Sequence, residues 1–220
     1  MRGRLPAKIL IRRRMFGCTV NAETELQLVS PADSEALFDL FTANHAYLRR
    51  WHPWVAGMNS LGDVGKVIDA WRQLYDRHQA VFASIRFQGR CCGMINLHKI
   101  DWPNRWAALS YWLAASHQGR GIMTQSSRTL IAHCFNNWQL NRVTIECATD
   151  NLRSRAIAQR LGFREEGLVR EIEWLEDRFA DHVMYGLLRG DCAEGYPTVS
   201  SPSVQSRRQQ PQLVHGGAAR

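Results

Sequence analysis

The sequence predicts an α/β (α+β) fold, with a mixed, mostly antiparallel sheet of about seven strands covered by helices on both faces. Short apolar or alternating runs typical of strands recur along the chain, and runs with apolar residues at helical spacing separate several of them. One stretch, 109–135, combines a strand, a glycine-containing loop and a helix. At 220 residues, the chain is long enough for one domain with a substantial core.

The first half of the chain is expected to begin with a strand, continue through helices and end in a hairpin. Ser30, Pro31 and Asp33 are typical of a helix start, because Ser caps, Pro fits the first position and an acid suits the first turn. Gln88 and Gly89 favour a tight hairpin turn. The expected elements are a strand at 24–29, helical pieces at about 30–41 and 47–51, a helix at 63–78, and strands at 80–87 and 90–100.

The second half is expected to alternate strands and helices and to end in strands. From Met123 onward, apolar residues recur at helical spacing. Asp150 or Asn151 can cap a later helix, and Gly162 fits the position just after its C-terminus. The expected elements are a strand at 109–114, a helix from 123, a strand at 142–149, a helix at about 156–161, and strands at 168–175 and 179–188.

The net charge of +8 is concentrated at the two ends of the chain. Residues 1–14 contain six Lys or Arg and no acid, and residues 197–220 contain three Arg and no acid. Between them, 19 basic residues stand against 20 acidic ones, so this part is nearly neutral. We therefore expect a domain at 15–196, a disordered basic extension at 1–14 and a disordered basic tail at 197–220, without direct nucleic-acid binding by the core.

The six cysteines form no C-x-x-C pair, and no His and Cys residues have the spacing of a zinc site. We expect reduced thiols, no bound metal and a cytoplasmic location. No stretch approaches the ~20 apolar residues that a membrane helix needs, so no contact with a membrane is expected.

The loop at 118–123, with the sequence QGRGIM, is a candidate phosphate site. Gly119 and Gly121 permit positive φ and close approach of a ligand to the backbone. Unpaired amides at the start of the following helix attract anions together with the helix dipole, and Arg120 adds a positive charge. The alternative is a plain helix start after a tight turn. Neither familiar nucleotide loop fits, since the Walker pattern is absent and Thr124 stands where the dinucleotide pattern needs Gly.

Several motifs occur in an order that resembles the GNAT superfamily of N-acetyltransferases. Within it, they resemble the RimL/RimJ type, which acetylates protein N-termini, notably those of ribosomal proteins. The resemblance extends from about Met15 to about Arg189, and the combination is specific although no single motif is. The motifs are SYWL (110–113), HQGRGIMT (117–124), NRV (141–143), DNLRS (150–154), LGF (161–163) and the late Asp181.

The resemblance implies the GNAT fold, with acetyl-CoA as cosubstrate. In that fold, strands four and five splay apart and the pantetheine arm lies between them. A backbone N–H near Trp112 and Leu113 would stabilise the thioester oxygen as it becomes an oxyanion, and Asn151 would hold the pantetheine or a water. The residues implied to hold the pyrophosphate are Gln118, Gly119, Arg120, Gly121, Ile122 and Met123.

Acetyl transfer also needs a group that accepts the amine proton and one that protonates or stabilises the leaving thiolate. The resemblance favours Glu173 as the base, 19 positions after Ser154, with Glu171 as the alternative. In a regular strand, alternation would put Glu171 and Glu173 on one face, opposite Ile172 and Trp174. Ser154 is the implied acid or hydrogen-bond donor to the sulfur. Relatives in the wider superfamily often use a tyrosine near this point, where this chain has none, and no histidine shows an evident catalytic pairing.

Trp51 and Trp54 flank Pro53 and form a rigid aromatic corner. This corner either packs under a loop or, as the resemblance implies, forms a wall of the acceptor pocket. Two residues depart from family patterns: Met123 ends the superfamily's Q-x-x-G-x-G/A pattern, as is common in the RimL type, and Ser110 stands where that type usually has Gly. Because Ser fits a strand, we expect no loss of cofactor binding.

These residues predict an N-acetyltransferase that transfers an acetyl group from acetyl-CoA to an amine by direct attack in a ternary complex. The favoured acceptor is the N-terminal α-amine of a (ribosomal) protein, whose pKa of about 8 demands only a modest base near neutral pH. The alternatives are a small amine (polyamine, amino acid or antibiotic), which an acidic, open groove would favour, and a non-catalytic CoA-binding module. Since relatives are often dimers, a homodimer is also expected.

Overall fold

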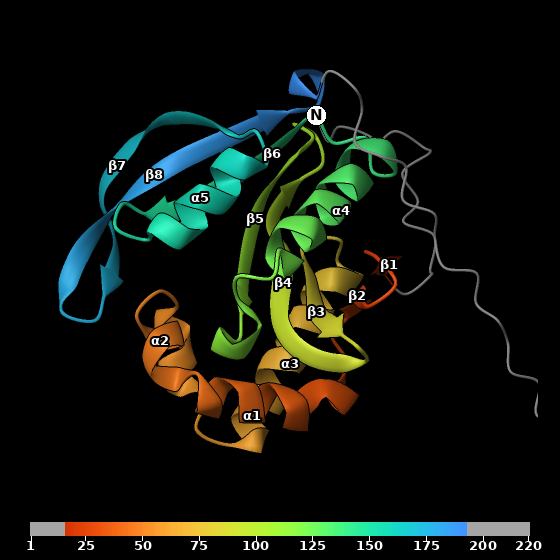
Figure 1. Ribbon diagram of the computed structural model, residues 1–220, viewed down its shortest axis with the longest axis vertical. Coiled ribbons are helices and arrows are strands. Elements are labelled where there is room, and N and C mark those ends of the chain that lie inside the picture. Colours follow the sequence, from red (N-terminus) through yellow and green to blue (C-terminus); the bar gives the residue numbers. More distant parts are fainter. Residues whose placement is uncertain (1–15, 193–220) are drawn as a thin grey trace, which may run out of the picture.

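The structure, a computed structural model, describes residues 16–192, so the segments expected to be disordered lie outside the described residues. Figure 1 shows one sheet with helices packed on it. The strands are β1 (Gly17–Thr19), β2 (Thr24–Leu28), β3 (Val81–Phe87), β4 (Arg90–Asp101), β5 (Trp106–Leu113), β6 (Arg142–Ala148), β7 (Arg164–Leu175) and β8 (Arg178–Leu188). The α-helices are α1 (Ser34–Ala43), α2 (His45–Arg49), α3 (Leu61–Asp76), α4 (Ile122–Asn136) and α5 (Leu152–Arg160).

The sheet is mixed and mostly antiparallel, as the sequence predicted. Within residues 16–192 its strand order is β1-β2-β3-β4-β5-β6-β8-β7, and the one parallel pair is β5 with β6. It contains eight strands rather than about seven. The additional strand is β1, which pairs with β2 over three residues and is too short to leave a periodic signal in the sequence.

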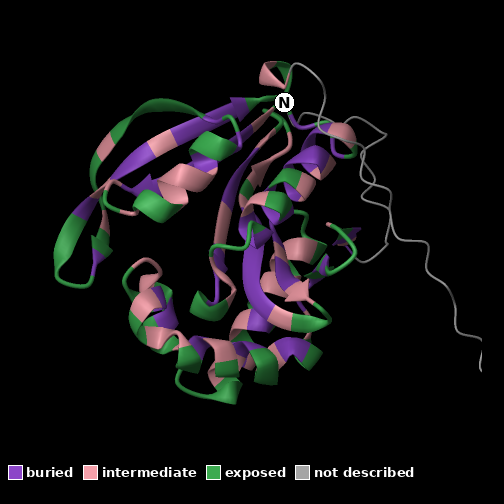
Figure 2. Cartoon of the chain, viewed as in Figure 1, coloured by how far each residue is buried: buried purple, intermediate pink, exposed green. Residues whose placement is uncertain are grey.

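Helices cover both faces of the sheet (Figure 1). α4 and α5 lie on one face, here called the α4–α5 face, where Leu130 and Phe135 belong to the larger apolar core. α1, α2 and α3 lie on the other, the α1–α3 face, where Phe41 packs with Met94 of β4 and Trp112 of β5 in a second core. Figure 2 shows the buried residues gathered along the sheet between these helices.

β5 and β6 diverge after a short paired region. They pair over Trp106–Ala108 on β5 and Arg142–Thr144 on β6, and not beyond. The last residues of both strands therefore border a gap in the middle of the sheet. This gap confirms the splayed strands that the family resemblance implied, and it connects the α4–α5 face with the α1–α3 face.

β7 departs from the regular alternation that the sequence suggested. Val169 pairs with His182 and Glu173 pairs with Ala180, so four steps along β7 match two along β8. The extra residues form a bulge centred on Glu171, whose φ is +50° and whose N–H donates to Asp181 Oδ1 at 2.8 Å. The period-two argument that grouped Glu171 with Glu173, opposite Ile172, is therefore wrong for this segment, because the bulge interrupts the pleat.

Candidate active site

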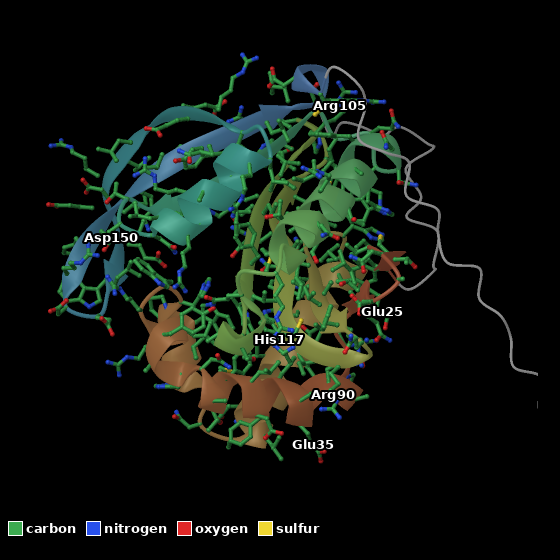
Figure 3. All side chains as sticks on the ribbon, in the orientation of Figure 1. Glu25, Glu35, Arg90, Arg105, His117 and Asp150 are labelled. Carbon is green, nitrogen blue, oxygen red and sulfur yellow. The ribbon has the colours of Figure 1, made fainter. Side chains whose placement is uncertain are left out.

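One cavity of about 2300 Å³ is lined by residues from both faces of the sheet at the gap between β5 and β6. Arg120 is exposed and, like the alternative base Glu171, does not line it. Figure 3 labels two lining residues, His117 from the loop before α4 and Asp150 from the loop before α5. All the other predicted site residues line it, namely Trp51, Trp54, Trp112, Leu113, Gln118, Gly119, Gly121, Ile122, Met123, Asn151, Ser154 and Glu173.

The loop before α4 has the backbone that a phosphate site needs. Gly119 and Gly121 have φ values of +77° and +75°, which a residue with a side chain adopts only with strain. Gly121 is the N-cap residue of α4 and offers no side-chain cap, so the amides of the first helical turn have no intrahelical partner. These amides and the dipole of a 15-residue helix together suit an anion.

Gln118 ties this loop to the rest of the site. Its Nε2 donates to the carbonyl of Leu113 at 3.0 Å, at the end of β5. Its Oε1 accepts from Arg153 of α5 at 2.5 Å. Gln118 therefore fixes the loop relative to β5 and to α5. Arg153 brings a positive charge to the side where the phosphates of a cofactor would lie.

Ser154 lies on the α4–α5 side of the gap, in the first turn of α5. Asn151 caps this helix by accepting from the N–H of Ser154 at 3.2 Å. The Ser154 hydroxyl donates to the hydroxyl of Tyr111 at 3.3 Å, and Tyr111 donates to the Ser154 carbonyl at 3.3 Å. Burial raises the pKa of Tyr111, so its hydroxyl stays protonated at neutral pH. The tyrosine that seemed absent near Ser154 is thus supplied by the central strand.

Along β5, the N–H and C=O groups of successive residues point alternately toward β4 and toward the gap. The N–H of Ala114 donates to the carbonyl of Cys92 on β4 at 2.8 Å, so Trp112, two residues earlier, also directs its peptide groups at β4. The N–H of Leu113 therefore points toward the gap. Of the two residues expected to stabilise the oxyanion, Leu113 has the suitable amide, whereas the Trp112 ring packs on Phe41 with the centroids 5.4 Å apart.

Glu173 reaches the cavity from the α1–α3 side of the gap. Its Oε2 lies 3.2 Å from Nε2 of His182, which is on the neighbouring strand β8. A second histidine, His52, interacts electrostatically with the same carboxylate. Burial lowers the pKa of His52 to about 4, although Glu173 and a hydrogen bond to the Tyr111 backbone oppose this, so His52 is neutral at neutral pH.

The aromatic corner packs in a core and also lines the cavity. Trp51 packs on Leu175, Ala180 and Ala148, and Trp54 packs edge-on to Trp71 with the centroids 5.9 Å apart. Both tryptophans nevertheless line the cavity, and Trp54 remains 40% exposed. The corner is therefore part of a core and a wall of the cavity at once.

Ion pairs lie beside this corner, and two of their residues, Arg50 and Asp150, line the cavity. Arg49 pairs with Glu176 in the β7–β8 turn at 3.6 Å, and Arg50 pairs with Asp150 at 3.7 Å. Arg178 also contacts Asp150, at 2.6 Å. With Trp51, these contacts join the end of α2 to the β7–β8 turn, and we call the assembly the α2–hairpin bridge. In Figure 1 the end of the β7–β8 hairpin extends toward α2.

The floor of the cavity on the α1–α3 face carries polar groups beside apolar ones such as Phe82 and Met94. Ser110 alternates with Tyr111 and shares the face of Trp112, and its Cα partner on β4 is Asn96. Glu146 of β6 also lines this region, between the core residues Ile145 and Cys147 that face α5. Ser110, the residue that departs from the family pattern, therefore lies opposite the predicted cofactor side.

Comparison with known proteins decides the family. The family model described as an acetyltransferase (GNAT) domain matches residues 24–164. The chain belongs to the GNAT acetyltransferase family. It is therefore an acetyl-CoA-dependent acetyltransferase, and acetyl-CoA fits the uncapped helix start and the gap described above.

Several similar proteins match most of the chain. A putative ribosomal N-acetyltransferase, YdaF, of Bacillus subtilis (strain 168) is 36% identical over 80% of this chain and 96% of its own. The ribosomal-protein-serine acetyltransferase of Escherichia coli (strain K12) is 31% identical over 76% of this chain and 93% of its own. A solved structure of RimL, a ribosomal L7/L12 alpha-N-protein acetyltransferase in complex with coenzyme A, has a TM-score of 0.77 and 29% identity, covering 79% of this chain and 98% of its own.

Two further observations bear on the predicted chemistry. All six cysteines lie in the described part of the chain and carry free thiols. Within residues 16–192, no cluster of His, Cys, Asp and Glu has the makings of a metal site, and no helix is long and apolar enough to cross a membrane.

Sequence reasoning missed three residues of this site: Tyr111, His52 and His182. Tyr111 could have been found from the alternation of β5, since it faces α5 whenever Trp112 faces α1. The two histidines gave no such signal, because their approach to Glu173 depends on strand register and on the bulge in β7.

Proposed function

We propose that this chain acetylates the N-terminal α-amine of a protein, with a ribosomal protein as the acceptor that its relatives' names suggest. The observation that carries the proposal is the position of Glu173 and Ser154 on opposite sides of one gap. A proton acceptor on the acceptor side and a hydroxyl donor on the cofactor side are what direct attack in a ternary complex requires.

In this mechanism, the loop 118–123 holds the pyrophosphate and the gap between β5 and β6 holds the pantetheine arm. The amine attacks the thioester carbon, and the Leu113 amide donates to the oxygen as negative charge develops there. Glu173 accepts the proton that the amine loses. The carbon–sulfur bond then breaks, and the Ser154 hydroxyl turns its proton from Tyr111 to the departing thiolate. The thiolate is finally protonated by water.

The charge of the acceptor side favours a polypeptide over a polycation. Its carboxylates are Glu173, Glu146 and Asp150, but Asp150 is already paired with Arg50 and Arg178. A groove built for a polyamine would present several unpaired acids. The polar floor at Ser110 and Asn96 instead offers neutral groups that can hydrogen-bond a peptide backbone.

The test is release of coenzyme A from acetyl-CoA with peptides that have free N-termini and, in parallel, with a panel of small amines. Glu173→Gln should lower kcat with peptides by about 100-fold or more, since a general base contributes ~10²–10⁴-fold. Glu171→Gln is the matched control and should leave kcat within about threefold. Turnover of small amines alone would refute the protein acceptor, and turnover unaffected by Glu173→Gln would refute the base.

The proposal also includes a cellular location and an oligomeric state. We place the reaction in the cytoplasm, which suits six free thiols and a ribosomal acceptor. A homodimer stays a prediction, and light scattering during size-exclusion chromatography would test it.

A further inference from the structure

His182 is a buried histidine with an unusual environment. It is 9% exposed and lies on β8, where it pairs with Ala148 of β6 and Val169 of β7. Its Nε2 atom has no contact with solvent and makes no well-aligned hydrogen bond to any residue in 16–192. A buried nitrogen without such a partner lowers the stability of the fold by about 1–3 kcal/mol, so a role for this nitrogen is worth seeking.

The carboxylate of Glu173 supplies one. Its Oε2 is 3.2 Å from His182 Nε2, close enough for a hydrogen bond after a small rotation of either side chain. Glu173 itself is 40% exposed at the side chain and lines the cavity, so it has room to adopt other rotamers. A fixed donor beneath it would restrict that freedom.

The backbone that carries Glu173 is held by the same strand. The residue before His182 is Asp181, and its carboxylate accepts from the N–H of Glu171 at 2.8 Å. This contact stabilises the positive φ of Glu171 in the bulge just before Glu173. Two adjacent residues of β8 therefore act on β7, Asp181 on the backbone and His182 on the carboxylate.

We infer that His182 is a positioning residue, which aims the Glu173 carboxylate at the acceptor amine by donating a hydrogen bond from Nε2. The inference rests on the proposed function of Glu173 as the base. His182 does not touch the amine in this arrangement and acts only through Glu173. A base oriented by a third group is a recurrent arrangement in enzymes, because a misdirected carboxylate loses most of its effect.

The inference predicts how three substitutions behave in the full-length chain with a peptide acceptor. His182→Leu should lower kcat about tenfold and leave the KM for acetyl-CoA within twofold. His182→Gln, whose amide nitrogen can occupy the place of Nε2, should recover most of that loss. Val183→Ala is the matched control, since Val183 is the next residue of β8, is buried on the opposite face and does not line the cavity.

The decisive measurement is a double-mutant cycle of His182→Leu with Glu173→Gln. If His182 acts through Glu173, the double variant should have the same kcat as Glu173→Gln alone. A full tenfold further loss in the double variant, an unchanged kcat in His182→Leu, or an equal loss in Val183→Ala would overturn the inference. A parent-like kcat in Glu173→Gln would instead overturn the base itself, so the two failures are distinguishable.

Discussion

The hydroxyl oxygen of Tyr111 lies 3.3 Å from Oγ of Ser154, across the α4–α5 side of the gap between β5 and β6. The two residues are 43 positions apart in the sequence and meet because α5 begins directly after β6. Tyr111 is a poor net source of a proton, because burial raises its pKa. Its contribution is to orient the smaller hydroxyl of Ser154.

This relationship predicts that removing the two hydroxyls lowers kcat by unequal amounts and that the two losses are not additive. Ser154→Ala should lower kcat about tenfold, and Tyr111→Phe only about threefold, in line with hydrogen bonds worth ~0.5–1.5 kcal/mol. The double variant should match Ser154→Ala, because Tyr111 acts through Ser154. Steady-state kinetics at saturating acetyl-CoA would measure this, and a larger loss in Tyr111→Phe than in Ser154→Ala would contradict it.

Gly121→Ala should weaken acetyl-CoA binding. The φ of +75° at Gly121 would strain alanine by roughly 1 kcal/mol or more, and relief of the strain would move the amides that begin α4. We expect the KM for acetyl-CoA to rise about five- to tenfold. Gly65→Ala in α3 is the control: a Cβ there meets nothing within 4 Å, so it should leave the KM unchanged and stabilise the helix slightly. Equal KM values in both variants would show that the loop conformation is not needed for binding.

Ser110→Gly should affect the use of the peptide substrate without affecting the binding of acetyl-CoA. The Ser110 side chain faces the polar floor on the α1–α3 face, away from the cofactor loop. We therefore expect an unchanged KM for acetyl-CoA and an altered kcat/KM among peptides that differ in their second and third residues. Two residues of strand span about 6.7 Å, which is the distance along β5 from Trp112 to Ser110. A raised KM for acetyl-CoA without any change in peptide preference would contradict this assignment.

Folding stability should decrease below neutral pH, partly through His133. Burial among apolar and aromatic side chains, with the Trp138 ring centroid 4.7 Å away, lowers the pKa of His133 to about 4. The unfolded chain, with a pKa near 6.5, binds a proton between pH 6.5 and pH 4 that the folded chain does not. Stability is therefore present above pH 6.5 and is lost as pH falls toward 4.

Melting temperatures measured from pH 7.5 to pH 4.5 would test this. His133→Phe, which keeps an aromatic ring and removes the titrating group, should flatten the acid side of the profile. His52 has a similarly lowered pKa and should contribute a parallel slope, so the flattening will be partial. Identical profiles for the parent and His133→Phe would refute the role of His133.

The sequence predicts those parts of the site that depend on short-range pattern. The strand–loop–helix unit at 109–135, the cap at Asn151 and the turn at Gln88-Gly89 all follow from residue types a few positions apart. These features are local because capping and positive φ depend only on neighbouring backbone.

The remaining parts depend on register and could not be read in advance. The approach of His182 to Glu173 requires both the pairing of β7 with β8 and the bulge at Glu171, and nothing in the residue types between 169 and 173 marks a bulge. Likewise, β1 is three residues long and forms only because β2 offers it an edge. Contacts across strands are set by the whole sheet, so a single-sequence pattern misses them.

The α2–hairpin bridge lies beside the entrance that an acceptor would use, so we expect it to limit the shape of molecule that can reach the gap. Arg49 pairs with Glu176 and Arg50 pairs with Asp150, and Arg50, Asp150 and Trp51 line the cavity. The end of an extended chain can enter beside these ion pairs without breaking them. An amine in the middle of a folded surface could enter only if the ion pairs broke. We therefore expect the bridge to favour free chain ends over internal lysines. Glu176→Gln should raise the rate with N-terminally blocked peptides that contain lysine relative to the rate with free N-termini, and coenzyme A release with the two peptide sets would measure this.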